Sequence, residues 1–450
     1  MTTITTVVET SQVPPPPTTA ALSLPLSYFD IIWIPFHPIR RLLFYNHPCS
    51  NSHFFETIIP KLKQSLSLAL EHFLPLSGNL IYPSNSDQKP LFRYLPGDSV
   101  QLAIAVSGSD FDSLVANHAR NADQFYDFIP ETPAIKNEPD YKIIPVFALK
   151  VTLFPDHGIC IGYSNHHSIG DASSIFSFMK TWSSIAKIGE SDKSDSPVFD
   201  RTIINDPLGI DSIFWKTVKE IPFLSSSFHL PTNRVRATFT LHPSDIQKLK
   251  QIVLTKKPEL VQVSSFVVTV SFVWSCMKRA GVEVGEKIGE NVPSEEMFVY
   301  TVDVRGRTDP AVPGNYFGNC LAYGKVCLER EELVGDGGFV KAAEAIAKSI
   351  KNKVNKKGEL LKGAENWVSE WGEYMKRRIV GVSGSPRFDL YGLDFGWGRA
   401  RKLEVVSIDA ESYSMSLCKS NGSDGGLEIG LSLPKDMMRA FEAMFDEGLA

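Results

Sequence analysis

The residue types best suited to chemistry gather in the segment 165–172, whose sequence is NHHSIGDA. This segment separates a strand expected over 159–164 from a helix expected after it, and side chains at such a junction can point into a cleft. A histidine with its ordinary pKa of about 6.5 is mostly neutral at pH 7 and can accept a proton from a hydroxyl group. His167 is therefore our candidate general base, with a structural histidine at a strand end as the alternative.

Two neighbours of His167 have other expected roles. Adjacent residues on an extended segment face opposite ways, so His166 and His167 are badly placed to bind one metal ion, and we predict no metal site. Asp171 stands at the expected N-cap of the following helix, where its carboxylate can accept backbone N–H groups. It could also pair with Arg305 or Arg307, so we predict a structural rather than a catalytic role for it.

Strands and helices are predicted to alternate irregularly around this segment. Residues 146–154 and 159–164 are rich in apolar and β-branched side chains on either side of a PDHG turn signal, which predicts a hairpin. After Asp171, apolar residues recur every three or four positions, which predicts an amphipathic helix. Further strands are predicted at 235–241, 298–304, 403–417 and 427–433, and further helices at 54–73, from 243, over 264–279 and over 340–354. The pattern favours an α/β fold with mixed sheets.

Length and composition narrow the class of protein. The 450 residues are 43% hydrophobic and 22% charged, which is typical of a globular chain and argues against disorder. The net charge of −5 offers no overall basic field for nucleic acid or anionic lipid. The six cysteines have no zinc-type spacing, and no stretch has the features of a secretory signal or a membrane span. We therefore expect a cytoplasmic protein with no nucleic-acid or membrane partner.

Composition shifts along the chain predict its organisation. Residues 1–20, rich in Thr, Ser and Pro, are predicted to form a flexible N-terminal arm. Residues 191–232 lack clear periodicity and carry clustered Ser, Asp and Pro, which predicts a crossover loop between two domains. The predicted N-terminal domain spans 21–190 and carries the HHSIGDA segment, and the predicted C-terminal domain spans 233–450.

Three motifs together resemble one protein family. HHSIGDA resembles the H-x-x-x-D motif of the plant BAHD acyl-CoA-dependent acyltransferases, and residues 394–398, DFGWG, resemble that family's second motif. Between them, residues 315–320, NYFGNC, resemble the Y-F-G-N-C motif of the branch that acylates anthocyanins and other flavonoid or phenolic glycosides. Their order and separation also match, and the resemblance extends from about Leu22 to the C-terminus.

The resemblance implies a fold and a mechanism. The fold would be two similar-sized chloramphenicol-acetyltransferase-like domains with a solvent channel at their interface, in a monomer with no permanently bound cofactor. His167 would deprotonate an acceptor hydroxyl that attacks the thioester of an acyl-CoA co-substrate, without a covalent enzyme intermediate. Asp171, Arg305 and Trp397 would support the site structurally, and Asp394 of the second motif would be a further catalytic residue.

The same resemblance implies residues that hold acyl-CoA. Ser264 and Ser265 resemble the family's segment near pantetheine and phosphate, and Lys250 would bind the ribose phosphate. Ser383 and Gly384 belong to an SGSP sequence that resembles the loop lining the cofactor arm. The alternative for each is an ordinary surface residue.

The donor is implied to be malonyl-CoA, whose free carboxylate is best bound by a guanidinium group. Some malonyltransferases of the family carry an arginine eight residues after the catalytic histidine, but this chain has Ile175 there. Arg40 is our candidate replacement, and its neighbour Arg41 is the alternative.

The predicted reaction is transfer of malonyl to the 6-hydroxyl of a glucose on a flavonoid, an anthocyanin or a simple phenol. A hydroxycinnamoyl-CoA donor is the first alternative. A non-catalytic member that binds phenolics or CoA is the second, and an enzyme acting on carrier-bound thioesters is disfavoured because no carrier domain is attached. A serine hydrolase and a protein kinase are excluded, since the sequence has no G-x-S-x-G elbow and no H-R-D segment.

Overall fold

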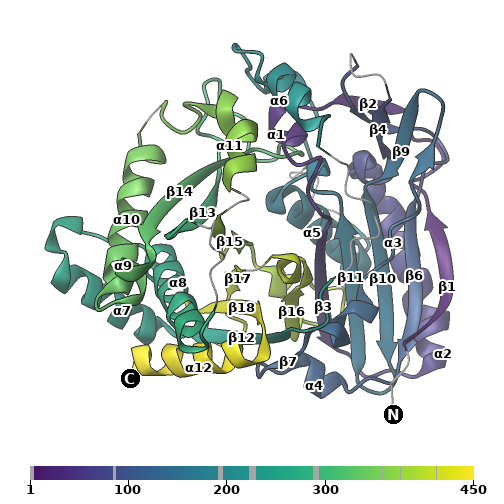
Figure 1. Cartoon of the computed structure of the whole chain (residues 1–450). Coiled ribbons are helices and arrows are strands. Elements are labelled where there is room, and N and C mark those ends of the chain that lie inside the picture. Colours follow the sequence, from purple (N-terminus) through teal and green to yellow (C-terminus); the bar gives the residue numbers. More distant parts are fainter. Residues whose placement is uncertain are drawn as a thin grey trace.

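A computed structural model describes residues 5–84, 88–190, 196–221, 230–286, 293–356, 358–374, 377–411 and 413–450. The chain forms two halves that lie side by side, each built on a large β-sheet with helices packed against it (Figure 1). Both large sheets combine parallel and antiparallel pairs. The predicted α/β fold with mixed sheets is therefore confirmed.

The first sheet has six strands in the order β1–β6–β10–β11–β3–β16. Their bounds, in that order, are Thr5–Val13, Val100–Ser107, Phe147–Phe154, Gly158–Asn165, Ile39–Asn46 and Lys402–Val405. β10 and β11 form the predicted hairpin, and all of their residues are buried. Helices α3 (Ile59–His72) and α5 (Ala172–Ile188) share the apolar core on one face, while α4 (Phe111–Val115) and η3 (Ala122–Phe128) bury phenylalanines against the other. Cover on both faces fixes the end of β11, where the HHSIGDA segment begins.

The predicted flexible N-terminal arm is wrong over residues 5–13, because these residues form β1. This strand pairs antiparallel with β6 along its whole length at the edge of the sheet (Figure 1). Its threonines and valines are β-branched residues that favour strands. Val7 and Val8 remain about half exposed, so an edge strand of this kind lacks the apolar periodicity that would have revealed it.

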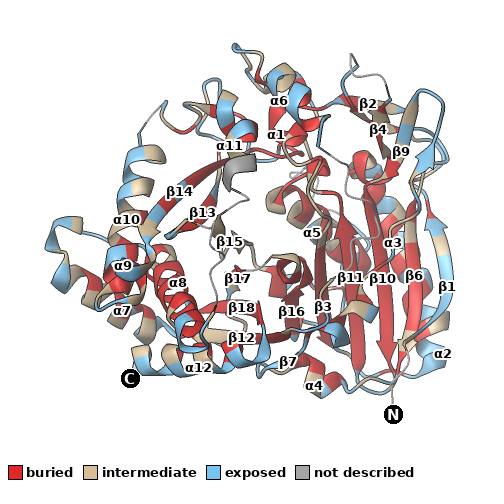
Figure 2. Ribbon diagram, in the orientation of Figure 1, coloured by how far each residue is buried: buried red, intermediate tan, exposed pale blue. Residues whose placement is uncertain are grey.

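The second sheet has seven strands in the order β14–β13–β15–β17–β18–β12–β7. Their bounds, in that order, are Leu321–Glu329, Glu295–Asp303, Arg378–Ser383, Ser414–Lys419, Leu427–Leu433, Val235–Leu241 and Arg120–Asn121. Its core is completed by four helices, α7 (Pro243–Lys256), α8 (Ser265–Glu283), α10 (Gly338–Lys353) and α12 (Lys435–Leu449). Figure 2 shows the buried residues concentrated in α8 and in the strands of both sheets.

Most predicted elements of the second half are present, but the strand predicted over 403–417 is wrong. That segment divides into β16, the 3₁₀ helix η10 (Val406–Ala410) and β17. β16 and η10 are largely buried and β17 buries alternate residues, so apolar side chains recur across all three and hide the breaks.

The remaining elements lie around these two sheets. A third sheet has the order β2–β5–β4–β9–β8, with bounds Leu22–Pro25, Leu91–Tyr94, Asn79–Pro83, Tyr141–Pro145 and Lys136–Asn137. The predicted crossover loop at 191–232 contains two elements within its described part, η6 (Arg201–Ile203) and α6 (Ile210–Val218). α6 packs against α1 (Tyr28–Ile31), because Phe214 and Trp215 give it an apolar face that must be buried. α6 is thus part of the core, so the described part of this stretch is more than a loop.

Each half contributes a short strand to the sheet of the other. β16 comes late in the chain yet pairs with β3, and β7 comes early yet pairs with β12. Sheet membership therefore departs from the predicted division of the chain at these two places. Across the described ranges, no helix is both long and apolar enough to cross a membrane.

Candidate active site

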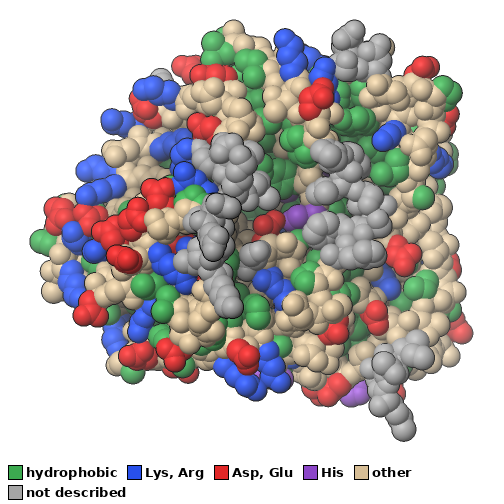
Figure 3. All heavy atoms as spheres, viewed as in Figure 1, with side chains coloured by type: hydrophobic (Ala, Val, Ile, Leu, Met, Phe, Trp, Pro, Cys, Tyr) green, Lys and Arg blue, Asp and Glu red, His purple; other side chains and the backbone are tan. Residues whose placement is uncertain are grey.

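A cavity of about 1160 Å³ opens between the two halves. Figure 3 shows the molecular surface hollowed there, with hydrophobic and histidine side chains visible inside. The first half contributes seven residues between 32 and 41 and the segment that follows β11, and the second half contributes residues of β13 and β15. The walls of the cavity therefore come from both halves of the chain.

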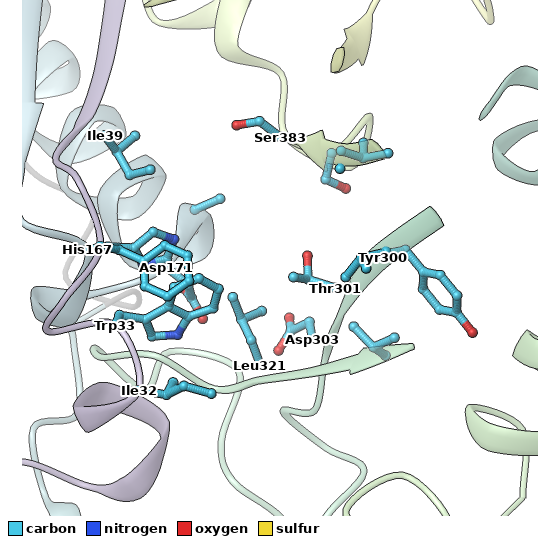
Figure 4. A pocket seen from close by; sticks show the side chains of 18 of the residues that line it. Ile32, Trp33, Ile39, His167, Asp171, Tyr300, Thr301, Asp303, Leu321 and Ser383 are labelled. Atoms are coloured by element: carbon cyan, nitrogen blue, oxygen red, sulfur yellow. The ribbon is translucent and has the colours of Figure 1, made fainter. Parts of the chain in front are cut away.

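His167 lies on the wall of this cavity. Its ring stacks on Trp33 with 3.9 Å between centroids and 8° between planes (Figure 4). Nδ1 is buried, so Nε2 is the nitrogen that faces the cavity. Thr301 and Asp303 of β13 and Ser383 of β15 lie across from it (Figure 4).

The surroundings keep the His167 ring neutral. Burial, with a smaller contribution from nearby His37 and Arg41, lowers its pKa to about 4, although Asp171 and a backbone hydrogen bond act in the opposite direction. A neutral imidazole at pH 7 can accept a proton from an alcohol. His166 points elsewhere, since its Nδ1 lies 2.7 Å from the Ser168 hydroxyl, so the two rings do not converge on a common point.

Asp171 performs both of the structural roles considered for it. It caps α5 by accepting the backbone N–H groups of Ser173 and Ser174 at 3.1 and 3.2 Å. Its two carboxylate oxygens also accept from the two terminal nitrogens of Arg305 at 2.8 and 3.1 Å. Because Arg305 follows β13, this bidentate pair joins the histidine segment to the second half of the chain. Arg307 is exposed and lies on the cavity wall instead.

A second set of contacts to the histidine segment was missed by the sequence analysis. Asn319 donates its side-chain N–H groups to the backbone carbonyls of His167 and Ser168 at 3.0 and 3.1 Å. Asp30 holds Asn319 in place by accepting from its backbone and side-chain nitrogens. Asn319 belongs to the NYFGNC motif, so the available signal was a motif to which we had assigned no structural role.

The catalytic prediction for Asp394 is wrong. Its carboxylate accepts the backbone N–H groups of Gly396 and Gly398 at 2.8 Å each and pairs with Lys187 at 2.8 Å, and it does not line the cavity. Both glycines have positive φ, 96° and 83°, so the aspartate closes a tight turn. Trp397 of the same turn stacks near His47 and packs edge-on against Tyr45, so it supports β3 from outside the cavity.

The residues predicted to hold acyl-CoA divide into two groups. Ser383 and Gly384 line the cavity. Ser264, Ser265 and Lys250 do not, although Phe266 beside the two serines does. Ser264 caps α8, since its hydroxyl accepts the backbone N–H of Val267 at 3.2 Å.

Arg40 is wrong as the candidate for an acyl carboxylate, and Arg41 takes its place on the cavity wall. Successive side chains of a strand point to opposite faces. Ile39 and Arg41 of β3 face the cavity, whereas Arg40 shares the opposite face with the core residues Leu42 and Phe44. Because side chains alternate between the two faces of a strand, Arg40 and Arg41 cannot both face the cavity. Only one of the two could therefore bind the acyl carboxylate.

Comparisons with known proteins give one consistent result. A family model described as the Transferase family matches residues 2–447. The malonyl-coenzyme:anthocyanin 5-O-glucoside-6'''-O-malonyltransferase of Salvia splendens is 54% identical, covering 99% of this chain and 96% of the relative. Phenolic glucoside malonyltransferase 1 of Nicotiana tabacum is 42% identical, covering 99% of each chain. The crystal structure of vinorine synthase matches with a TM-score of 0.71 at 20% identity, covering 97% and 96%, and it confirms the predicted two-domain fold.

Proposed function

The chain belongs to the BAHD family of acyl-CoA-dependent acyltransferases, and from this premise we propose that it transfers malonyl from malonyl-CoA to the 6-hydroxyl of a glucose on a flavonoid, anthocyanin or phenolic glucoside. The observation that carries the proposal is the neutral His167 ring, which lies in a cavity shared by both halves. The names of the similar malonyltransferases support the donor and the glucoside acceptor.

In the proposed reaction, His167 Nε2 takes the proton of the glucose hydroxyl as its oxygen attacks the thioester carbonyl carbon. The carbonyl electron pair moves to its oxygen, and the tetrahedral intermediate then collapses as the carbon–sulfur bond breaks. The imidazolium returns the proton to the departing CoA sulfur, so His167 ends neutral and no enzyme-bound acyl group forms. General-base help of this kind contributes about 10²–10⁴-fold in rate, and alignment of two bound substrates contributes further.

Aromatic side chains beside His167 support an aromatic acceptor. Trp33 and Phe36 of the first half meet at 4.8 Å between centroids, and Phe36 meets Trp371 of the second half at 5.3 Å. All three line the cavity. Offset or edge-on contacts between aromatic rings are favourable, so this cluster suits the flat aglycone of a phenolic or flavonoid glucoside.

The donor is proposed to enter along the opposite wall, past Ser383 and Gly384. Ser264, Ser265 and Lys250 lie outside the cavity, where they would meet the distal, phosphate-bearing end of CoA. Ser264 and Ser265 stand at the N-terminus of α8, an end of a helix that favours phosphate groups. No cofactor bound between turnovers is needed in this scheme, and acyl-CoA is consumed as a co-substrate.

Steady-state assays with the purified chain test the proposal. Malonyl-CoA should be preferred over coumaroyl-CoA on the same glucoside, with the product identified by mass spectrometry, and preference for the aromatic donor would refute malonyl transfer. His167→Ala should lower kcat about 10²–10⁴-fold. His53→Ala, which changes an exposed histidine away from the cavity, is the matched control and should leave kcat unchanged. Absence of CoA release by the wild type would instead indicate a binding protein.

A further inference from the structure

We propose that Arg41 is the group that binds the free carboxylate of the donor's acyl chain. The inference rests on the proposed malonyl donor and names the residue that selects it. It places a dicarboxylic acyl group, with its thioester carbonyl beside His167 and its carboxylate on β3.

The position of Arg41 on β3 fits this role. Ile39 lies on the same face of the strand, and Figure 4 shows Ile39 close to His167 on one wall of the cavity. Arg41 also lines a small recess that it shares with Gly384, so it lies toward the wall along which the donor is proposed to enter. In malonyl-CoA one methylene separates the carboxylate from the thioester carbonyl. A receptor for that carboxylate must therefore lie near the base, and Arg41 lines the same cavity as His167 and is close enough to lower its pKa.

The guanidinium of Arg41 is buried but only partly satisfied. Its exposed fraction is 5%, and Nη1 donates to the Tyr163 hydroxyl at 3.3 Å, while Nε has no hydrogen-bond partner. Within the described part of the chain, no carboxylate lies at ion-pair distance from it. A buried cation without an anion is costly, so such a site favours an anionic ligand.

Three other buried arginines each pair with a carboxylate, so a buried guanidinium without such a partner is unusual in this molecule. Arg120 and Arg236 each pair with Glu404 at 2.9 Å, and Arg305 pairs with Asp171 at 2.8 Å. A guanidinium can bind a carboxylate through two parallel hydrogen bonds, and the unfilled donors of Arg41 leave that mode open.

The other cationic or candidate positions on the cavity wall fit less well. His37 pairs with Glu411 at 3.0 Å, and Arg305 is occupied by Asp171. Arg307 and Arg387 are exposed, where water weakens their attraction for a carboxylate. Ile175 is apolar and offers no charge. Arg41 is thus the lining cation whose burial and unused donors match a small acyl carboxylate.

The test compares two donors that differ in the carboxylate, malonyl-CoA and acetyl-CoA, on the same glucoside. Arg41→Met removes the charge and keeps a chain of similar length. It should lower kcat/KM for malonyl-CoA about 10- to 100-fold and change kcat/KM for acetyl-CoA less than about threefold. Arg41→Lys keeps the charge but loses the paired N–H donors of the guanidinium. Its kcat/KM for malonyl-CoA should lie between those of the wild type and Arg41→Met. Arg40→Met, on the opposite face of the same strand, should leave the ratio of the two kcat/KM values unchanged.

If the wild type prefers malonyl-CoA and Arg41→Met leaves the ratio of kcat/KM for malonyl-CoA to kcat/KM for acetyl-CoA unchanged, the inference about Arg41 is overturned. Malonyl transfer itself would still stand. A wild type that prefers coumaroyl-CoA overturns both. If Arg41→Met fails to fold, two other measurements replace it. One is kcat/KM of Arg41→Lys for malonyl-CoA, and the other is kcat/KM of the wild type for the methyl ester of malonyl-CoA, which lacks the charge. Equal kcat/KM for the acid and its ester would also overturn the role of Arg41.

Discussion

The chemistry of His167 depends on what its ring touches. One face is covered by Trp33, Nδ1 is buried, and the backbone carbonyl of the residue is held by Asn319. These contacts leave one nitrogen and one direction for proton transfer. They also shield most of the ring from water, and burial is the main reason that its pKa lies near 4.

The pH dependence of kcat/KM should therefore lack the usual histidine limb near pH 6.5. The base must be neutral to accept a proton, and a pKa of about 4 means that protonation inactivates it only in that region. We expect kcat/KM to stay level from about pH 8 down to about pH 5 and to fall tenfold per unit below about pH 4. Initial rates measured across this range, with circular dichroism to confirm that the protein remains folded, give the profile. A limb centred near pH 6.5 would contradict the burial of the ring.

At the same scale, some site residues could be predicted from the sequence and others could not. His167 and Asp171 stand at a strand-to-helix junction, where local pattern determines position, and Arg305 was one of two arginines considered as the partner of Asp171. Asp394 was misassigned because a motif identifies a residue without showing which way its carboxylate points. The stacking of Trp33 on His167 joins segments far apart in the chain, and no local pattern of apolar residues reports such a contact.

At the scale of elements, the most informative feature is the exchange of β7 and β16 between the sheets. Glu404 of β16 lies between Arg120 of β7 and Arg236 of β12, with 2.9 Å to each. Arg236 also pairs with Asp409 of η10, and all four side chains are buried. The exchanged strands are short, with four residues in β16 and two in β7. We therefore expect this charge cluster to contribute much of the free energy that holds them in place. β7 was not predicted, and β16 was predicted only as the start of a longer strand over 403–417, since such short elements carry no periodicity of their own.

Glu404→Gln should lower the free energy of unfolding by about 3–5 kcal/mol, because it leaves two buried arginines without their shared carboxylate. Burial would raise the pKa of Glu404, but Arg120, Arg236 and Lys402 outweigh it and lower the pKa to about 2, compared with 4.5 in the unfolded chain. The carboxylate therefore stabilises the fold fully above about pH 4.5, and this contribution is lost as the pH falls toward 2. Urea unfolding at several pH values should show the deficit of the variant shrinking over that window.

The control for this prediction is Asp389→Asn, which breaks the partly exposed pair with Arg399 in the same half. Surface pairs contribute about 0–1 kcal/mol, so this variant should be close to the wild type. Equal losses for the two variants would show that the buried cluster has no special part in holding the exchanged strands.

At the scale of the whole molecule, the two halves share an apolar core and are joined in three further ways. The largest core cluster contains Val299 of β13 and Tyr323 of β14 together with residues of the first half. The exchanged strands cross between the sheets, the Asp171–Arg305 pair connects the histidine segment to the end of β13, and the cavity takes its walls from both halves. The class of fold could be predicted because each half has its own periodic elements. The interlocking could not, because it depends on contacts between residues more than one hundred positions apart.

The interlocking predicts that the two halves unfold together. Separating either sheet would withdraw β7 or β16 from the other and expose Glu404 and its arginines, so a state with only one half folded should be scarcely populated. Differential scanning calorimetry should show one transition whose calorimetric and van't Hoff enthalpies agree. CoA, which is proposed to bind between the halves, should shift that single transition upward, with a stabilisation of about 2.7 kcal/mol at a concentration one hundred times Kd. Two resolved transitions, or a shift in only part of the signal, would mean that the halves are independent and that the exchanged strands do not couple them.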